Sequence, residues 1–382
     1  IAGARLAQNL KKGFTEAVQG SIAALTAFYY KLSQSTQQLI EFEKELMNAN
    51  SVFNMTNADL FKASDTIVQF GQQYGMAMQN GATGLYQLAS AGLSLEDSMT
   101  VLPNTLKLSM AVMGDHNSIA KLTTQTLFGF GMAAEEAALL TDKFAYTIQK
   151  SLVEYQDLGS AVKFALPFFT ATGQSIDQLL GALQILTNRA LEAGIAGRGL
   201  RQALSEFAEH AEDNSAAFRK MGLEILNVDG SMKQLNVIAA EYARLIGPEA
   251  AHNTKLLTAM IQDLNVRGAT AFIHLVQSSD EFTAAVEATA NAGGELQTMV
   301  DIQNESISAQ IQILKNNVEM IFFMRDATFE GTDALNGFHK AVIDGVASLR
   351  GLIVEGEEGA YKLTSFGIAI QDVAVAGVET LV

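Results

Sequence analysis

Cysteine and tryptophan are both absent from this chain of 382 residues, and proline occurs only three times. Without cysteine the chain can form no disulfide, no thiolate nucleophile and no thiolate metal site. Charged residues are also scarce, at 17% against 48% hydrophobic residues. The chain can therefore bury a large core, its composition is not that of a disordered protein, and no linker-like stretch forces a domain boundary.

Basic residues are outnumbered by acidic residues. There are 25 Lys and Arg against 41 Asp and Glu, so the net charge is 25 − 41 = −16. Affinity for nucleic acid comes mainly from cations placed on phosphates. We therefore expect no specific nucleic-acid binding and a surface past which DNA can slide, although the same charge also fits an ordinary soluble acidic protein.

No catalytic, cofactor-binding or metal-binding pattern is present. The histidines are scattered singly and lack metal-ligand spacing, at His116, His210, His252, His274 and His339. Four residues that fall close together on one expected helix are interpreted as a solvated acidic face, namely Glu206, Glu209, His210 and Glu212. The glycine-rich segment Gly194–Gly199 lacks the lysine that a phosphate loop requires. We therefore predict no catalytic residue, cofactor or metal. A glycosidase remains an open alternative, because its chemistry needs only two carboxylates and no sequence motif excludes them.

Helical periodicity dominates the chain and predicts an all-α fold. The first segment has apolar residues at heptad spacing, which predicts an oligomerisation seam at Val18, Leu25, Phe28, Leu32, Leu39, Phe42 and Leu46. A long amphipathic helix over residues 3–53 follows, either as a coiled coil or packed on the chain's own core. A second seam at Ile307, Ile311, Leu314, Val318 and Ile321 predicts a further long helix near residues 296–325.

The segment between these two helices is predicted to be a helical core of short packed helices. The expected division is 1–56 for the long helix, 57–295 for the core and 296–382 for a C-terminal helical segment. Helix-start signals in the core occur at Asn57, at Ser94 with Asp97, at Gly131 to Glu135, at Ser175 with Gln178, and at Asn214 or Ser215. Their spacing of 37 to 41 residues is the length of a helix pair. We interpret it as similar helix lengths and not as true repeats, because the units share no other side-chain pattern.

Small residues form the other distinctive pattern. They remove side-chain bulk where helices approach closely or turn sharply, and the predicted helix-packing positions are Ala89, Ala91, Gly92, Gly194, Gly197 and Gly199.

Thr66–Leu95 is an uncharged run of 30 residues interrupted by six amide side chains. Because each amide would be costly in lipid, the run favours a helical hairpin buried in protein. A membrane-active, pore-forming all-α protein is the alternative that would use this run. An α-helical scaffold for binding partners is a third possibility.

Three small-residue motifs occur in a fixed order. They are LYQLASAGLSLEDSM at Leu85–Met99, FGFGMAAEEAALLTDKFA at Phe128–Ala145 and NRALEAGIAGRGLRQAL at Asn188–Leu204. Together with a glycine-turn element in which Asp229 and Gly230 make the turn, this series resembles the conserved core of phage tail tape-measure proteins. The resemblance runs from about Phe42 to Phe323. It departs from the family pattern at AGIAGRGLR, which is shorter than the usual glycine-rich element.

The resemblance implies a structural protein without enzymatic activity or cofactor. Such a protein sets tail length during assembly, occupies the lumen of the tail tube and is released ahead of DNA during genome ejection. The implied partners are the tail tube protein, tail tip or baseplate hub proteins, and copies of the chain itself in a trimer. The host membrane is a further partner that the resemblance leaves open for ejection. The implied location is the tail tube lumen or tail tip of the virion, and the host cytoplasm during assembly.

Overall fold

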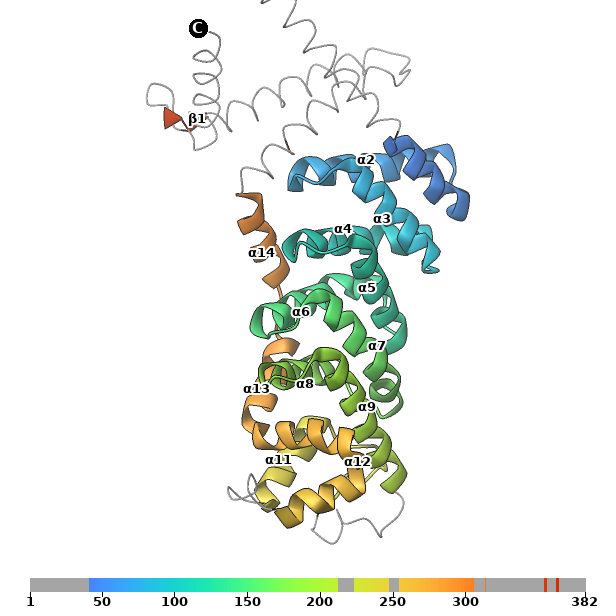
Figure 1. Cartoon of the computed structure of the whole chain (residues 1–382). Helices are drawn as coiled ribbons and strands as arrows, with labels where there is room; N and C mark the ends of the chain where they lie inside the picture. Colours follow the sequence, from blue (N-terminus) through green and yellow to red (C-terminus); the bar gives the residue numbers. More distant parts are fainter. Residues whose placement is uncertain are drawn as a thin grey trace, which may run out of the picture. The chain divides into compact units, whose positions relative to one another are not determined.

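The computed structural model describes residues 41–211, 223–246, 254–305, 313, 354–355 and 362–363. Helices make up nearly all of these residues, which confirms the predicted all-α class (Figure 1). Two short strands, β1 (Val354–Glu355) and β2 (Lys362–Leu363), pair antiparallel.

A helix over residues 41–53 is followed by a series of further helices. The first half of the series is α2 (Asn57–Tyr74), α3 (Met78–Ser90), α4 (Leu95–Ala111), α5 (His116–Phe130), the 3₁₀ turn η1 (Ala134–Glu136), α6 (Ala137–Lys150) and α7 (Tyr155–Ala171). The second half is α8 (Ile176–Asn188), α9 (Ala193–His210), α11 (Leu235–Ile246), α12 (Thr254–Gln277), α13 (Ser279–Ala290) and α14 (Glu295–Asn304).

The chain folds into two compact units. The first comprises Ile1–Ser51, Met55–Ala82 and Ile307–Val382, and the second comprises Val52–Asn54 and Thr83–Ser306. These limits fall at other positions than the sequence-based division at 56/57 and 295/296, which stays a prediction.

In the first unit, Phe42 and Leu46 of the predicted seam are buried on the helix over residues 41–53. The other five seam residues, and all five of the second seam, lie outside the described residues. The start of α2 corrects one expectation. Thr56, not Asn57, is the N-cap: its hydroxyl accepts a hydrogen bond from the Asp59 amide, and the Asp59 carboxylate accepts one from the Thr56 amide.

In the second unit, successive helix pairs stack on one another (Figure 1). Helices α4, α6 and α8 pack in series and form what we call the first column, and α5, α7, α9 and α12 pack in series as the second column. Each pair contacts mainly the pair before it and the pair after it, as in repeat proteins. The spacing between the starts near residues 94, 134 and 175 therefore reports stacked helix pairs, which corrects, for these starts, the interpretation that it reflects only similar helix lengths.

The repeated pairs also share a glycine that the sequence analysis did not connect with them. Gly92, Gly131 and Gly173 each follow a helix of one pair with positive φ, at 95°, 65° and 70°. Each precedes the N-cap of the next pair by one intervening residue, the caps being Ser94, Ala133 and Ser175. The amide after each glycine bonds a carbonyl five residues earlier, which closes the Schellman turn. The predicted starts at Ser94, at Gly131 to Glu135 and at Ser175 are confirmed, whereas Asn214 and Ser215 lie outside the described residues.

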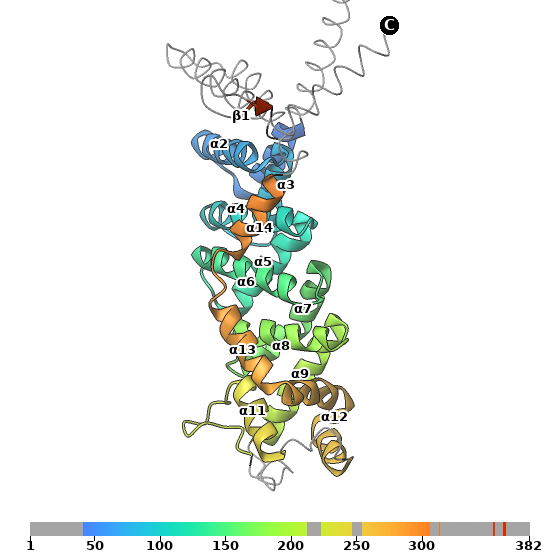
Figure 2. The same cartoon turned by 90° about the vertical axis from the view of Figure 1, so that its left-hand side faces the viewer.

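After α12 the chain runs back along the stack as α13 and α14, residues 279–304, which we call the return segment (Figure 2). Helix α13 packs on α8 and α11, and α14 packs on α4 and α6. The two views place this segment on the side of the first column away from α5, α7 and α9. The return segment thus ties several helix pairs together.

Candidate assembly site

The second column packs through positions where no side chain fits. A Cβ added at Gly197 of α9 would overlap the backbone carbonyl of Ala161 in α7. On the other side of α9, a Cβ at Gly199 would lie 2.7 Å from the Ala271 side chain of α12. Gly268 of α12 returns the contact, because its Cβ would meet the Ala203 amide nitrogen at 3.0 Å. These distances bring α9 into near-backbone contact with both neighbours.

The structure separates the six predicted helix-packing residues by role. Gly197 and Gly199 lie at the closest approaches. A Cβ at Gly194 would meet nothing nearer than the Ser160 hydroxyl at 3.4 Å, an ordinary contact. Ala89 is buried at the end of α3 and Ala91 is half-buried in the turn that follows. Gly92 has open space around it, and its positive φ identifies it as a turn residue.

Other close approaches were not predicted. A Cβ at Gly84 would lie 2.5 Å from the His116 ring, one at Gly129 would overlap the Leu166 side chain, and one at Gly181 would lie 3.0 Å from the Val286 amide nitrogen. Gly129 lies within the second small-residue motif, Phe128–Ala145, so that motif was a signal for it, whereas Gly84 and Gly181 lie outside all three motifs. The sequence gives no means of telling a contact glycine from a turn glycine, because the distinction depends on the neighbouring helix.

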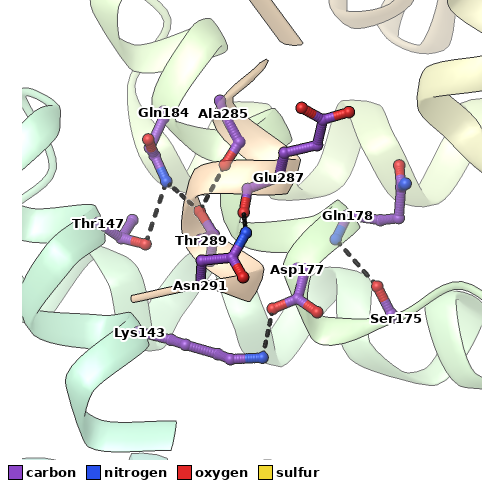
Figure 3. Close-up of polar contacts among 10 residues, drawn as sticks. All are labelled: Lys143, Thr147, Ser175, Asp177, Gln178, Gln184, Ala285, Glu287, Thr289 and Asn291. Atoms are coloured by element: carbon purple, nitrogen blue, oxygen red, sulfur yellow. Dashed lines mark hydrogen bonds and ion pairs between the residues drawn. The ribbon is translucent and has the colours of Figure 1, made fainter. Parts of the chain in front are cut away.

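Polar side chains connect the first column to the return segment (Figure 3). The buried Gln184 amide of α8 donates to the Thr289 hydroxyl of α13 at 2.8 Å and to the Thr147 hydroxyl of α6 at 3.4 Å. One side chain thereby joins three helices. Because an unpaired polar group at this depth would be costly, these partners fix how α13 sits on the stack.

The start of α8 carries a second set of buried amides. Gln174 donates to the carbonyl of Lys233 and accepts from the amide of Leu235. Gln178 accepts from the backbone of Asn236 and donates to its side chain. Gln178 was predicted as the partner of the Ser175 cap, and its backbone amide does donate to the Ser175 hydroxyl. Its side chain instead holds the start of α11.

Charged side chains fasten the same elements. Lys143 of α6 forms a largely buried ion pair with Asp177 of α8 at 2.6 Å. The Asp142 carboxylate accepts from the amides of Gly294 and Leu296, so it stabilises the N-terminus of α14. Lys107 of α4 donates to Gln297 of α14 at 3.0 Å. The return segment is therefore bonded at three levels of the stack.

A histidine is enclosed where α3, α4 and α5 meet. Its Nε2 lies 3.1 Å from the Thr105 hydroxyl, and burial lowers the pKa of His116 to about 4. The adjacent Asp115 caps α5, and hydrogen bonds from the backbone and hydroxyl of Ser118 hold the pKa of its carboxyl below the usual range. His116 is thus neutral at pH 7.

The predicted glycine turn is confirmed. Leu226 and Met232 bridge antiparallel, and Gly230 has a φ of 85° at the turn. The Asp229 carboxylate accepts from the Ser231 hydroxyl and amide, which lowers the pKa of Asp229. The turn exposes Val228 completely at its tip.

Only part of the expected acidic face on α9 lies within the described residues. Glu206 accepts a hydrogen bond from Gln202 on the same helix, Glu209 is exposed, and Glu212 lies outside the described residues.

Across the described part of the chain, no group of three or more His, Cys, Asp or Glu side chains is arranged to hold a metal ion. No helix among the described residues is both long and apolar enough to cross a membrane. The uncharged run Thr66–Leu95 is broken by turns between α2, α3 and α4.

Comparison with known proteins gives a consistent result. The sequence profile of the family described as phage-related minor tail protein matches residues 64–260. The chain is 21% identical over 313 residues to a protein named tape measure protein from Pneumococcus phage Dp-1, covering 82% of this chain and 26% of that protein. It is 19% identical over 325 residues to a probable tape measure protein from Escherichia phage P2, covering 84% of this chain and 39% of that protein. No solved structure matches. These matches confirm the predicted resemblance to tape-measure proteins.

Proposed function

Since the chain belongs to the phage-related minor tail protein family, as the match over residues 64–260 shows, we propose that it is the folded core of a tail tape-measure protein. In this role the parent protein sets tail length during assembly, occupies the tail tube lumen and leaves ahead of DNA during genome ejection. The chain spans 26% and 39% of the lengths of the two relatives above, so the proposal assigns part of that work to this chain and part to sequence beyond it.

The observation that carries the proposal is the stack of helix pairs fastened by the return segment. A single helix of the 183 residues from Leu95 to Gln277 would span about 270 Å at 1.5 Å per residue. The stack instead consists of four layers of helices spaced about 10 Å apart, which together span roughly 40 Å. Such a stack contributes little length per residue. We therefore assign measurement to extended helical regions and anchoring to the stack.

Partners and location follow from this division of work. We propose that the stack meets tail tip or baseplate hub proteins, and that the extended regions line the lumen formed by the tail tube protein. Self-association, as a trimer, is assigned to the Val18 to Leu46 seam. No catalytic step, cofactor or specific nucleic-acid contact is part of the proposed role.

The experiment is an in-frame deletion series in the phage that encodes the chain, with tail length read from electron micrographs. Deletions in extended helical regions should shorten the tail by about 1.5 Å per residue removed. Deletions within Leu88–Leu204 should instead stop tail assembly, because they expose apolar surface and remove helix partners. Normal tails from a phage that lacks a whole helix pair would contradict the anchoring role.

A further inference from the structure

The return segment carries charge of one sign. The segment together with Glu305, which directly follows it, contains no Lys or Arg and six acidic residues, at Asp280, Glu281, Glu287, Glu295, Asp301 and Glu305. All of these are exposed except Glu295, which is half-buried. Within the described structure, Glu281 forms an ion pair with Arg189, and no ion pair is formed by the other five. An acidic strip therefore follows the return segment past α8, α6 and α4.

The second column carries a small excess of positive charge, although Asp157 and Glu209 on it are also exposed. Helices α5, α7, α9 and α12 hold six Lys or Arg and four Asp or Glu, in a chain whose net charge is −16. Five of the basic side chains are described, and none of these five forms an ion pair within the described structure: Lys121, Lys163, Arg198, Arg201 and Arg267. Lys121, Lys163 and Arg267 are exposed, and Arg198 lies over the Phe164 ring at 5.0 Å. Each helix of the column contributes at least one of them.

Both surfaces also expose apolar side chains. Ile302 is 65% exposed on the return segment, and Phe128, Ile195 and Val266 are between 48% and 60% exposed on the second column. Apolar groups beside charged groups are typical of interface surfaces, where the apolar contact provides affinity and the charges provide register.

We propose that the second column of one copy of this chain docks along the return segment of another copy. The two surfaces run past the same helix pairs, so they lie opposite each other along their lengths when two copies are parallel and in register. Such a contact joins different surfaces of the two partners and is heterologous, so a ring closes when the rotation between neighbours permits it.

The charge pattern favours a second copy over nucleic acid. The column offers five described cations, and the return segment of the same unit is acidic, so a phosphate backbone would meet few attractive contacts and much repulsion. A second copy brings its own acidic strip to the column. The docking goes beyond the Val18 to Leu46 seam, because it uses other residues and requires only that copies of the chain lie side by side.

The test uses the full chain and measures self-association by sedimentation equilibrium at about 50 mM salt, where exposed charges are weakly screened. A column variant combines Lys121→Glu, Lys163→Glu and Arg267→Glu. A return variant combines Asp280→Lys, Glu287→Lys and Asp301→Lys. Each variant alone should weaken association at least about tenfold, and a variant with all six substitutions should restore it, because the charges are complementary again.

Circular dichroism of each variant checks that the helices are retained. If a variant fails to fold, cysteine cross-linking replaces it, because the chain has no cysteine of its own. Chains with Gln125→Cys on α5 should cross-link to chains with Thr298→Cys on α14, and two Gln125→Cys chains should not cross-link to each other. Both positions are exposed. Cross-linking of column to column at equal yield would overturn the proposal.

Three further outcomes would overturn it: association unchanged in both charge variants, no restoration in the combined variant, or loss of duplex DNA binding by the column variant without loss of self-association. A separate seam variant, Leu25→Glu with Leu32→Glu, keeps this test distinct from the proposed function. If only the seam variant dissociates the chain, the docking is wrong and the trimer proposal stands.

Discussion

The two columns of the stack are held by different physical means. The second column packs through Gly197, Gly199 and Gly268, where helices approach until backbone atoms limit the distance. The first column is held by the Lys143–Asp177 pair between α6 and α8. The return segment is joined to it by polar bonds such as that from Gln184, besides one close approach at Gly181. Close backbone packing fixes the distance between helices, but it does not select a particular partner side chain. Polar bonds specify which partner is correct and cost free energy when that partner is missing.

The largest expected effect comes from filling the closest approach in the second column. Gly197→Ala places a methyl group against the Ala161 backbone, which cannot move without shifting α7. We expect a loss of about 3 kcal/mol in the free energy of unfolding, measured by urea titration. The matched control is Gly159→Ala in α7, where a Cβ has open space and should stabilise the helix by about 0.5 kcal/mol. Equal effects of the two substitutions would remove the distinction between contact and open glycines.

The next effect comes from breaking the ion pair of the first column. Lys143→Met leaves the largely buried Asp177 carboxylate without its cation, and we expect a loss of about 2 kcal/mol at pH 7. Adding Asp177→Leu to Lys143→Met should recover most of that loss, because the uncompensated charge is removed. A double variant as unstable as the single one would mean that the pair contributes through packing alone.

Acid should destabilise the junction at His116. Its folded pKa of about 4 is below the usual value of 6.5, so the unfolded chain binds the proton more tightly. Stability is therefore full above the unfolded pKa and falls as the pH decreases from about 6.5 toward 4. We expect a loss of about 2 kcal/mol between pH 7 and about pH 4.5. In thermal melts across this range, His116→Gln should remove that part of the pH dependence; an unchanged profile would place its origin in other groups.

The smallest effect is local to the return segment. Gln184→Leu removes the bonds to Thr289 and Thr147, while the Thr289 hydroxyl keeps its bond to the Ala285 carbonyl. We expect a loss of about 1 kcal/mol and faster amide hydrogen exchange in α13 than in α9. Gln202→Leu is the control, because Gln202 bonds Glu206 on its own helix. Uniform acceleration in both helices would show that the bond is not specific to the return segment.

The sequence predicted features whose cause is local. The caps at Ser94 and Ser175 and the turn at Asp229 and Gly230 depend on residues close in the chain, and all three were found. The Asn57 start was placed one residue too late, because Thr56 forms the reciprocal bonds with Asp59. The shared glycines Gly92, Gly131 and Gly173 were visible in the sequence, and their spacing would have identified the stacked pairs.

The contacts between distant segments could not be predicted in the same way. Gln184 and Thr289 lie 105 residues apart, and Asp142 and Gly294 lie 152 residues apart. Nothing in the pattern of either residue identifies its partner, since buried glutamines and capping aspartates are common. Gly197 and Gly194 are likewise equivalent in the sequence, and only the position of α7 makes one a close contact.

The most direct test of the account is the tail length of phages that carry matched deletions inside and outside the stack. One phage lacks residues 133–172, which include η1 and the helix pair α6 and α7, and another lacks the same number of residues from an extended helical region of the parent protein. We predict no assembled tails from the first phage, and tails shortened by about 60 Å, or 1.5 Å for each of the deleted residues, from the second. Graded shortening in both phages would contradict the separation of an anchoring stack from a measuring helix.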